Sequence, residues 1–300
     1  MELNTKPKNN IDRYNYKIIG CGAVIKAFIK EILQMSIAVY LEIYVRDIKK
    51  YFTYEELPNI AFKNVKKLVT STNDIIIIAL SANESKIIQH NKSTSRDIVA
   101  RENISLIREL LSSVNLDNGC IFVLTNPSEL VAEYIYSNTN NKNIYSLGYY
   151  YDYVRYNNIL RKYIHDIDRF ELIGIHYLNP IISNNNFNYN EILLLEQRYI
   201  QQVTSEFTGY KPPIYSGVAN LINLILSIAN SNIILTSGYC KPYNAFLFGK
   251  LEIPRFEYKP NLPSSACVHD LLYDKLCLHY ANQIKLGIKH EDHNCVSTSM

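Results

Sequence analysis

The sequence lacks tryptophan entirely and lacks an excess of either charge. Lysine and arginine number 31 against 28 aspartates and glutamates, a formal net charge of +3, and the two signs are interspersed. This balance leaves no basic stripe, so we expect neither nucleic acid nor membrane headgroups as partners. The missing tryptophan says little about mechanism.

Long apolar runs are also absent. The longest, from Ile75 to Leu80, has the length of a strand, whereas a membrane-spanning helix needs about 20 apolar residues. The first ten residues are polar and contain no apolar core of a signal peptide. We therefore expect a soluble, cytoplasmic protein, long enough for one large or two medium domains.

Paired cysteine spacings are missing as well, which favours reduced thiols over a disulfide framework. Two C-x-H patterns occur, at Cys267-Val-His269 and Cys277-Leu-His279. Residues two apart on a helix point to different faces, so this spacing suits zinc poorly, and we expect no metal site. The six cysteines are scattered: Cys21, Cys120, Cys240, Cys267, Cys277 and Cys295.

A glycine turn near the N-terminus is the first motif with chemical content. The apolar run Tyr16–Ile19 leads into Gly20-Cys21-Gly22-Ala23-Val24-Ile25, and a helix-like apolar stripe follows. In a dinucleotide-binding turn the first glycine permits the bend and the second lets the backbone approach a pyrophosphate at the helix N-terminus. Ile25 stands where a third glycine is usual, so the match alone is weak. The predicted cofactor contacts here are Gly20, Gly22, Ala23, Val24 and Ile25.

An acidic residue closes the second predicted strand. Residues 37–45 form this strand, and Asp47 follows it, 27 positions beyond Gly20. An acidic side chain there holds the adenosine ribose hydroxyls and repels the extra phosphate of NADP, which favours NAD. The alternative is a solvated loop aspartate.

Strands continue to alternate with helices up to residue 126. A short strand is expected at 65–70, a strand apolar on both faces at 73–80, a helix at 104–114 and another buried strand at 119–125. Such alternation predicts a parallel sheet with right-handed crossovers. Ligands then bind at the C-terminal strand ends, where Gly20, Asp47, the 81–96 loop and Asn126 fall.

Three residues between 144 and 177 form the candidate catalytic group. Asp152 and Arg155 are one helical turn apart and share a face, and His176 lies beyond a polar crossover. An imidazole held by a buried carboxylate acts as a general acid and base. A guanidinium grips a substrate carboxylate with two hydrogen bonds. The alternatives are a surface ion pair and an unrelated histidine.

The order of these motifs, from residue 16 to 285, resembles the NAD-dependent L-lactate/L-malate dehydrogenases. NDIIIIALSA is similar to the strand before that family's active-site loop, and STSRDIVARENI supplies an arginine and an asparagine at the family spacing. Departures are Ile25, Leu80-Ser81, Ile175 and Tyr177. Three further segments of this chain are similar to motifs of the family: Asn126-Pro127-Ser128-Glu129, Gly148 through Asp152 to Arg155, and Gly174-Ile175-His176-Tyr177.

The resemblance implies a role for each polar residue. His176 exchanges a proton with the substrate carbonyl, and Asp152 orients its imidazole. Arg155 binds the substrate carboxylate, and Arg96, carried by a closing loop, polarises the carbonyl. Asn126 hydrogen-bonds near the carbonyl and the nicotinamide.

Further positions follow from the same resemblance. It implies a cis Asn126–Pro127 bond and adds Ser81 and Asn103 to the cofactor contacts. His90 occupies the position that reads the keto-acid side chain, where malate enzymes have arginine and lactate enzymes glutamine. The substrate therefore stays open, with pyruvate slightly preferred because no clear second arginine sits in the loop.

The predicted fold is α/β: a Rossmann-type NAD-binding domain at 1–146, then an α+β catalytic domain at 147–300. The second domain contains an apolar helix at 218–228, which lines the active site or is an ordinary core helix. It adds antiparallel strands at 233–236, 246–248 and 251–254, a helix at 271–284 and a disordered tail from 291.

The predicted function is an NAD-dependent 2-hydroxy-acid dehydrogenase that interconverts a small 2-keto acid and its hydroxy acid, as a homodimer or homotetramer. The alternative is a catalytically impaired relative that keeps the fold for binding or assembly. The departures from the glycine pattern favour the alternative. The retained polar residues oppose it, because burying charged groups has a desolvation cost that a scaffold has no need to offset. These residues are Arg96, Asn126, Asp152, Arg155 and His176.

Overall fold

The computed structural model describes residues 13–54, 57, 59–82, 96–163, 170–184, 187–206, 214–230, 233–263 and 265–288. His90 and the predicted tail lie outside these ranges. Within them, none of the helices combines the length and apolar character needed to cross a membrane.

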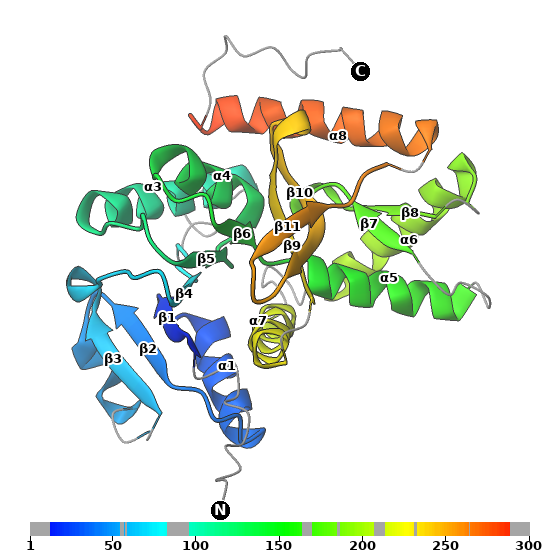
Figure 1. Cartoon of the computed structure of the whole chain (residues 1–300). Coiled ribbons are helices and arrows are strands. Elements are labelled where there is room, and N and C mark those ends of the chain that lie inside the picture. The colour runs from blue at the N-terminus through cyan, green and yellow to red at the C-terminus, as the bar shows by residue number, and fades with distance from the viewer. Residues whose placement is uncertain are drawn as a thin grey trace, which may run out of the picture.

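Six parallel strands form the first part of a nine-stranded sheet (Figure 1). They run in the order β3-β2-β1-β4-β5-β6, which is the strand order of a doubly wound dinucleotide-binding sheet. The predicted parallel sheet is thus confirmed. Its strands are β1 (Asn15–Ile19), β2 (Leu41–Val45), β3 (Ile60–Asn64), β4 (Asp74–Ile78), β5 (Cys120–Val123) and β6 (Ile144–Ser146).

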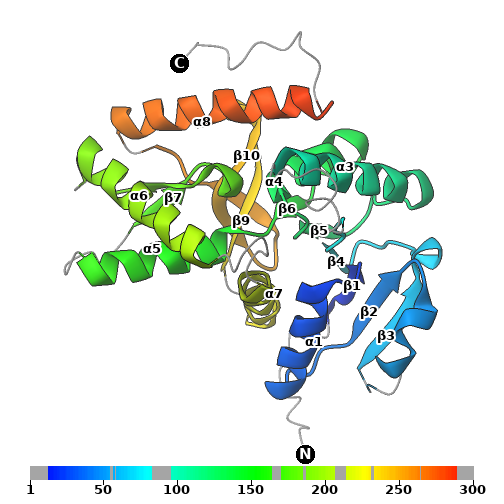
Figure 2. The ribbon, with the colours of Figure 1, turned by 180° about the vertical axis from the view of Figure 1, so that it is seen from behind.

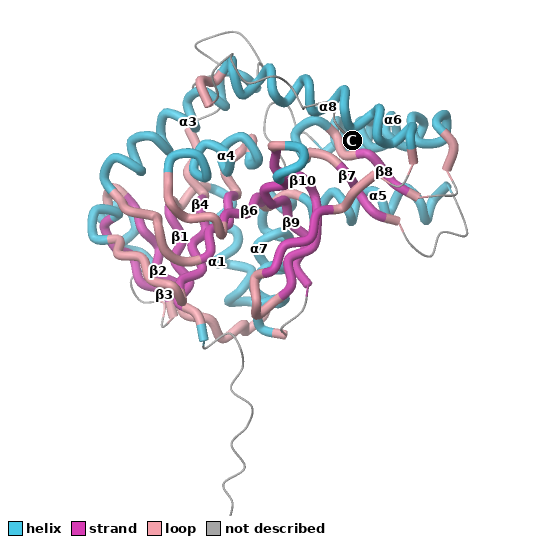
Figure 3. The backbone as a smooth tube through the Cα atoms, turned by 45° about the horizontal axis from the view of Figure 1, so that its top comes forward, coloured by secondary structure: helices cyan, strands magenta, loops and turns pink. Residues whose placement is uncertain are grey.

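Three antiparallel strands extend this sheet beyond β6: β9 (Ile233–Cys240), β10 (Ala245–Glu252) and β11 (Glu257–Pro260). Tyr145 of β6 pairs with Gly238 of β9, so one sheet runs through both parts of the chain, and Figure 3 shows its strands side by side. The antiparallel pairing was predicted. The prediction of separate strands at 246–248 and 251–254 was wrong, because a single strand, β10, covers all of the first range and half of the second.

Alternation along β4 explains why both faces of the sheet are covered. Ile75 and Ile77 point into one core and Ile76 and Ile78 into another, and all four are fully buried. The first core is completed by α1 (Ala23–Gln34) and α7 (Ile214–Ala229). The second is completed by α3 (Arg96–Ser113) and α4 (Ser128–Asn138), as Figures 1 and 2 show.

A third core lies beside the antiparallel strands and contains stacked aromatic rings. Tyr149 stacks on Phe248 with ring centroids 4.3 Å apart, and Tyr156 stacks on Tyr199 at 4.7 Å. Its elements are α5 (Tyr149–Tyr163), α6 (Tyr189–Glu206), α8 (Ala266–Lys285) and a hairpin-like pair, β7 (Glu171–Ile173) and β8 (Ile181–Ser183).

The prediction of a strand at 65–70 was wrong. The strand in this region, β3, ends at Asn64, and a 3-10 turn, η3 (Val65–Lys67), follows it. The side chain of Asn64 accepts a hydrogen bond from the Lys66 backbone N–H at 2.9 Å and so ends the strand. Val69 is 75% exposed, so its apolar character does not report a buried strand. β3 itself is an edge strand with mostly half-buried residues, which weakens its sequence signal.

A buried polar cluster joins α8 to α4, and it accounts for the second C-x-H pattern. His279 Nε2 lies 2.8 Å from Glu133 Oε1, and His279 Nδ1 lies 2.7 Å from the hydroxyl of Tyr177. Gln283 also donates to Glu133. His279, Glu133 and Gln283 are all at most 3% exposed. His279 is therefore a structural residue here, and Glu133 and Tyr177 each lose one hydrogen bond if its ring is removed.

Replacing His279 with leucine should lower the free energy of unfolding by about 3 kcal/mol, because a carboxylate and a phenol both lose a buried partner. Urea denaturation measures the change. His269→Leu is the matched control, since His269 is exposed on the same helix and its replacement should shift stability by less than about 0.5 kcal/mol. Equal effects of the two substitutions would contradict this account.

Candidate active site

The predicted glycine turn follows β1 and opens α1. Gly20 has φ +102°, and a Cβ built there would lie 2.6 Å from the carbonyl oxygen of Ala79, so only glycine fits. Gly22 is the N-cap of α1 and has no side-chain capping bond. A Cβ on Gly22 would meet nothing within 4 Å. The backbone at this helix start is therefore open to a ligand.

The helix start suits an anion. No acidic side chain lies in the first turn of α1, and Gly22 and Ala23 are exposed, so backbone N–H groups and the positive helix end face solvent. Ile25, in place of the third glycine, is 1% exposed within the core. Val24 packs on α7, where a Cβ at Gly217 would come within 2.7 Å of it. A pyrophosphate group fits these residues.

The two glycines should respond differently to alanine. Gly20→Ala should destabilise the fold by about 2 kcal/mol and abolish nucleotide binding, because alanine strains at positive φ. Gly22→Ala meets neither a positive φ nor a clash, so its stability should stay within about 0.5 kcal/mol of the wild type. Thermal unfolding and NADH fluorescence measure the two effects. Similar stability of both variants would refute the steric argument.

Asp47 lies just after β2, exposed to solvent. Its Oδ1 accepts a hydrogen bond from the Lys49 backbone N–H at 3.2 Å, and its Oδ2 lies 3.7 Å from Lys50 Nζ. Nearby, the hydroxyl of Tyr51 donates to the Cys21 carbonyl at 3.3 Å. This bond joins the segment after Asp47 to the glycine turn.

Asn103 ties two strand-end loops together. Its Nδ2 donates to the Asn126 carbonyl at 2.6 Å, and its Oδ1 accepts from the Ala82 backbone N–H at 2.7 Å. The side chain of Asn126 is exposed, and the Asn126–Pro127 bond is cis, as the resemblance implied. Ser81 is exposed beside Ala82. Arg96 begins α3, and its side chain lies outside the described part of the structure.

His176 and Asp152 come from different elements and are in direct contact. His176 opens the 3-10 turn η4 (His176–Leu178), and Asp152 lies in the first turn of α5. The Nδ1 of His176 hydrogen-bonds to Oδ2 of Asp152. A Cβ on Gly148 would lie 2.8 Å from Cγ of His176, so the glycine leaves room for the ring. The predicted pair is thus brought into direct contact.

Electrostatics favour a protonated His176. Burial acts to lower the pKa of its imidazole, but the charge of Asp152 and the hydrogen bond to it outweigh burial and raise the pKa above its ordinary value. Glu129 raises this pKa further, and Arg155 opposes it. The side chain of His176 is 23% exposed, so the ring can meet a ligand.

Asp152 is fully buried and holds three side chains. Besides His176, its Oδ1 accepts from Arg155 Nη1 at 2.9 Å and from the hydroxyl of Tyr199 at 2.6 Å. The sequence analysis missed Tyr199. A signal existed, because Ile192, Leu195 and Tyr199 share the buried face of α6, but nothing in the sequence indicated which carboxylate the tyrosine contacts.

The guanidinium of Arg155 faces a second carboxylate, Glu206, that the sequence analysis did not find. Arg155 Nε and Nη2 donate to Glu206 Oε2 at 3.0 and 2.6 Å. Glu206 is the last residue of α6 and lies 51 positions from Arg155, so no local pattern could have indicated this contact.

Glu129 lies on the other side of His176. Its Oε1 accepts from the His176 backbone N–H at 3.2 Å and from Ser237 Oγ at 3.2 Å, and the residue is fully buried. Glu129 therefore anchors the turn that carries His176 to α4 and β9. The sequence analysis recorded it only as part of the Asn-Pro segment.

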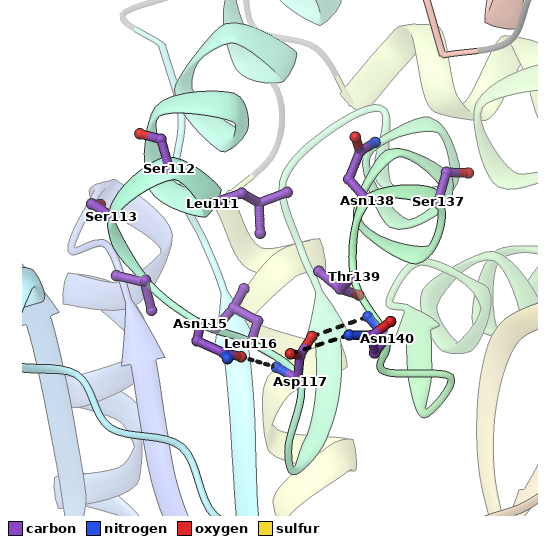
Figure 4. A pocket seen from close by; sticks show the side chains of 11 residues that line it. Leu111, Ser112, Ser113, Asn115, Leu116, Asp117, Ser137, Asn138, Thr139 and Asn140 are labelled. Carbon is purple, nitrogen blue, oxygen red and sulfur yellow. Dashed lines mark hydrogen bonds between the residues drawn. The ribbon is translucent and has the colours of Figure 1, made fainter.

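A surface depression of about 530 Å³ lies between the C-terminal ends of α3 and α4 (Figure 4). Asp117 at its edge accepts a hydrogen bond from the Asn140 backbone N–H at 3.0 Å. None of the predicted site residues lines it. In the described residues no group of three or more histidine, cysteine or acidic side chains is arranged to hold a metal ion.

No family model and no curated protein matches the sequence, whereas solved structures do. Malate dehydrogenase from Plasmodium falciparum has TM-score 0.70 at 17% identity, over 92% of this chain and 100% of that one. The enzyme from Archaeoglobus fulgidus, in complex with NADH, has 0.70 at 14%, over 91% and 99%. Minor L-lactate dehydrogenase from Enterococcus mundtii has 0.70 at 12%, over 93% and 99%. The chain has the fold of malate and lactate dehydrogenases.

Proposed function

We propose that the chain is an NAD-dependent 2-hydroxy-acid dehydrogenase, with pyruvate/lactate slightly preferred over oxaloacetate/malate. The observation that carries this proposal is the His176–Asp152 pair. A buried carboxylate fixes the tautomer of a partly exposed imidazole, and the same fold has an open glycine turn at the start of α1. Together these features suit a proton transfer beside a bound dinucleotide.

The residues that would hold the cofactor are those of the glycine turn, with Asp47 for the adenosine ribose and Asn126 for the nicotinamide end. Exposed Gly22 and Ala23 leave the start of α1 open to the pyrophosphate. The NADH complex of the Archaeoglobus fulgidus enzyme, which shares this fold, supports the choice of nicotinamide. NAD supplies hydride acceptance and donation when bound.

His176 would move the proton. Because Asp152 engages Nδ1, Nε2 is the nitrogen that faces the substrate oxygen. In reduction, Nε2–H donates its proton to the carbonyl oxygen as the alcohol forms; in oxidation, neutral Nε2 takes the hydroxyl proton. Asp152 stabilises the imidazolium, which is the form that its charge already favours.

The substrate would be oriented by Arg155 and Arg96. Arg155 lies one turn from Asp152 on α5 and is 4% exposed, so a carboxylate bound to it is fixed relative to His176. We assign Arg96 to the carbonyl oxygen, and His90 to the end of the substrate side chain. The assembly proposed is a homodimer or homotetramer in the cytoplasm.

NADH absorbance decay tests this function, with pyruvate, oxaloacetate and bulkier 2-keto acids in parallel. Turnover with any of them is the expected result, and the preferred acid identifies the side chain that is read. NADH binding without turnover on any acid would contradict the catalytic assignment. It would support the second candidate, a binding or assembly module, which the engagement of Arg155 by Glu206 favours.

A further inference from the structure

The anion-binding group of the candidate site already holds a carboxylate. Glu206 Oε2 accepts two hydrogen bonds from Arg155, from Nε and Nη2, and Oε1 lies 3.3 Å from Nε. The side chains of Arg155 and Glu206 are 5% and 11% exposed. Two N–H groups on one edge of a guanidinium are the fork that grips a planar carboxylate, and Glu206 occupies this edge.

The other sides of the guanidinium are also in use. Arg155 Nη1 donates to Asp152 at 2.9 Å, and the ring of Tyr151 lies against the guanidinium with its centroid 4.5 Å from Cζ. A substrate carboxylate therefore cannot add to Arg155 as a further partner on the Nε edge. It must take the place of Glu206.

The local charge balance points the same way. Burial acts to lower the pKa of Arg155, and the hydrogen bond to Glu206 with the charge of Asp152 raises it above its ordinary value. One guanidinium thus lies between two carboxylates. An incoming carboxylate meets repulsion from both, in surroundings where charge interactions are weakly screened.

Glu206 and Glu196 both lie on α6, and both form ion pairs. Glu196 has an ion pair at 2.5 Å with Lys275 of α8, whose ammonium also donates to the Leu178 carbonyl. The two glutamates differ in that the partner of Glu206 is also the partner of Asp152.

We propose that Glu206 sets the affinity of this site, as an internal carboxylate that competes with the carboxylate of an anionic substrate for Arg155. This inference rests on the proposed function, because it takes Arg155 as the substrate's anchor. Competition raises the substrate concentration needed for binding and leaves the proton transfer by His176 unchanged.

Glu206→Gln tests the competition, because it removes the charge and keeps the shape. The probe is oxamate, an unreducible analogue of pyruvate, titrated calorimetrically into the protein with and without saturating NADH. We expect at least tenfold tighter oxamate binding in the variant, about 1.4 kcal/mol. If the protein turns over pyruvate, KM should fall by a similar factor at unchanged kcat. Glu196→Gln is the matched control and should leave oxamate affinity unchanged.

The outcomes separate this inference from the proposed function. Tighter oxamate binding by Glu206→Gln supports the competition even if neither protein binds NADH, in which case the cofactor assignment fails instead. NADH binding with equal oxamate affinity in variant and wild type overturns the competition and leaves the dehydrogenase proposal standing. Absence of oxamate binding in both proteins also overturns it, since removing the charge then frees no anion site.

Discussion

Replacing His176 with alanine should lower turnover of the 2-keto acid by at least about 10²-fold, because general acid catalysis contributes roughly 10²–10⁴-fold. The ring is the group that carries the proton, and Asp152 keeps its bonds to Arg155 and Tyr199 without it. NADH binding should stay nearly intact, because the glycine turn lies on β1 and α1. Steady-state absorbance kinetics and NADH fluorescence measure the two quantities.

His269→Ala is the control for this substitution, since His269 is exposed on α8 and its loss should leave turnover unchanged. Equal turnover in His176→Ala and the wild type would remove His176 from the mechanism. Loss of NADH binding together with turnover would show instead that the substitution disturbs the cofactor site.

Asp152→Asn should move the pH dependence of keto-acid reduction to lower pH. Reduction requires protonated His176, so its rate falls as pH rises through the pKa of His176 in the complex. Asp152 holds this pKa above its ordinary value; in the variant the burial of the ring is no longer outweighed, and the pKa falls. At neutral pH the rate of reduction should therefore drop, approaching about tenfold for each unit of pKa lost once the pKa lies below the pH.

Stability should follow the same sign. Because the pKa of His176 is raised in the folded protein, the pair stabilises the fold fully below the ordinary pKa of histidine. That contribution is lost as pH rises through the raised value. Asp152→Asn removes this dependence. A reduction profile with its alkaline limb unmoved in Asp152→Asn would contradict the assignment of that limb to His176.

Much of the sheet could be predicted because its central strands carry strong patterns. The isoleucines of β4 are buried on both faces, which is typical of a central parallel strand. β3 was missed because an edge strand is half exposed. That the antiparallel strands join the parallel sheet could not be predicted, since the pairing of Tyr145 with Gly238 leaves no mark in either local sequence.

The site divides in the same way. Helical spacing placed Asp152 and Arg155 on one face, and His176 was a candidate to which the family resemblance gave a role; the structure brings the three together. Glu206 and Tyr199 reach the same cluster from α6, 51 and 47 positions from their partners. Their charges and hydroxyls follow no periodicity of their own, so only the packing of α6 on α5 reveals them. The functional roles and the domain division at 146 stay predictions.

The cover supplied by α7 has a consequence for the order in which the protein is assembled at the ribosome. Leu221, Leu224, Ile225 and Ile228 of α7 share the core that contains Ile75 and Ile77 of β4, and Val24 of α1 packs against Gly217. Residues 13–146 leave the translating ribosome before α7 exists. One apolar face of the nascent parallel sheet therefore stays incompletely covered until α7, which ends at residue 229, has also left the ribosome.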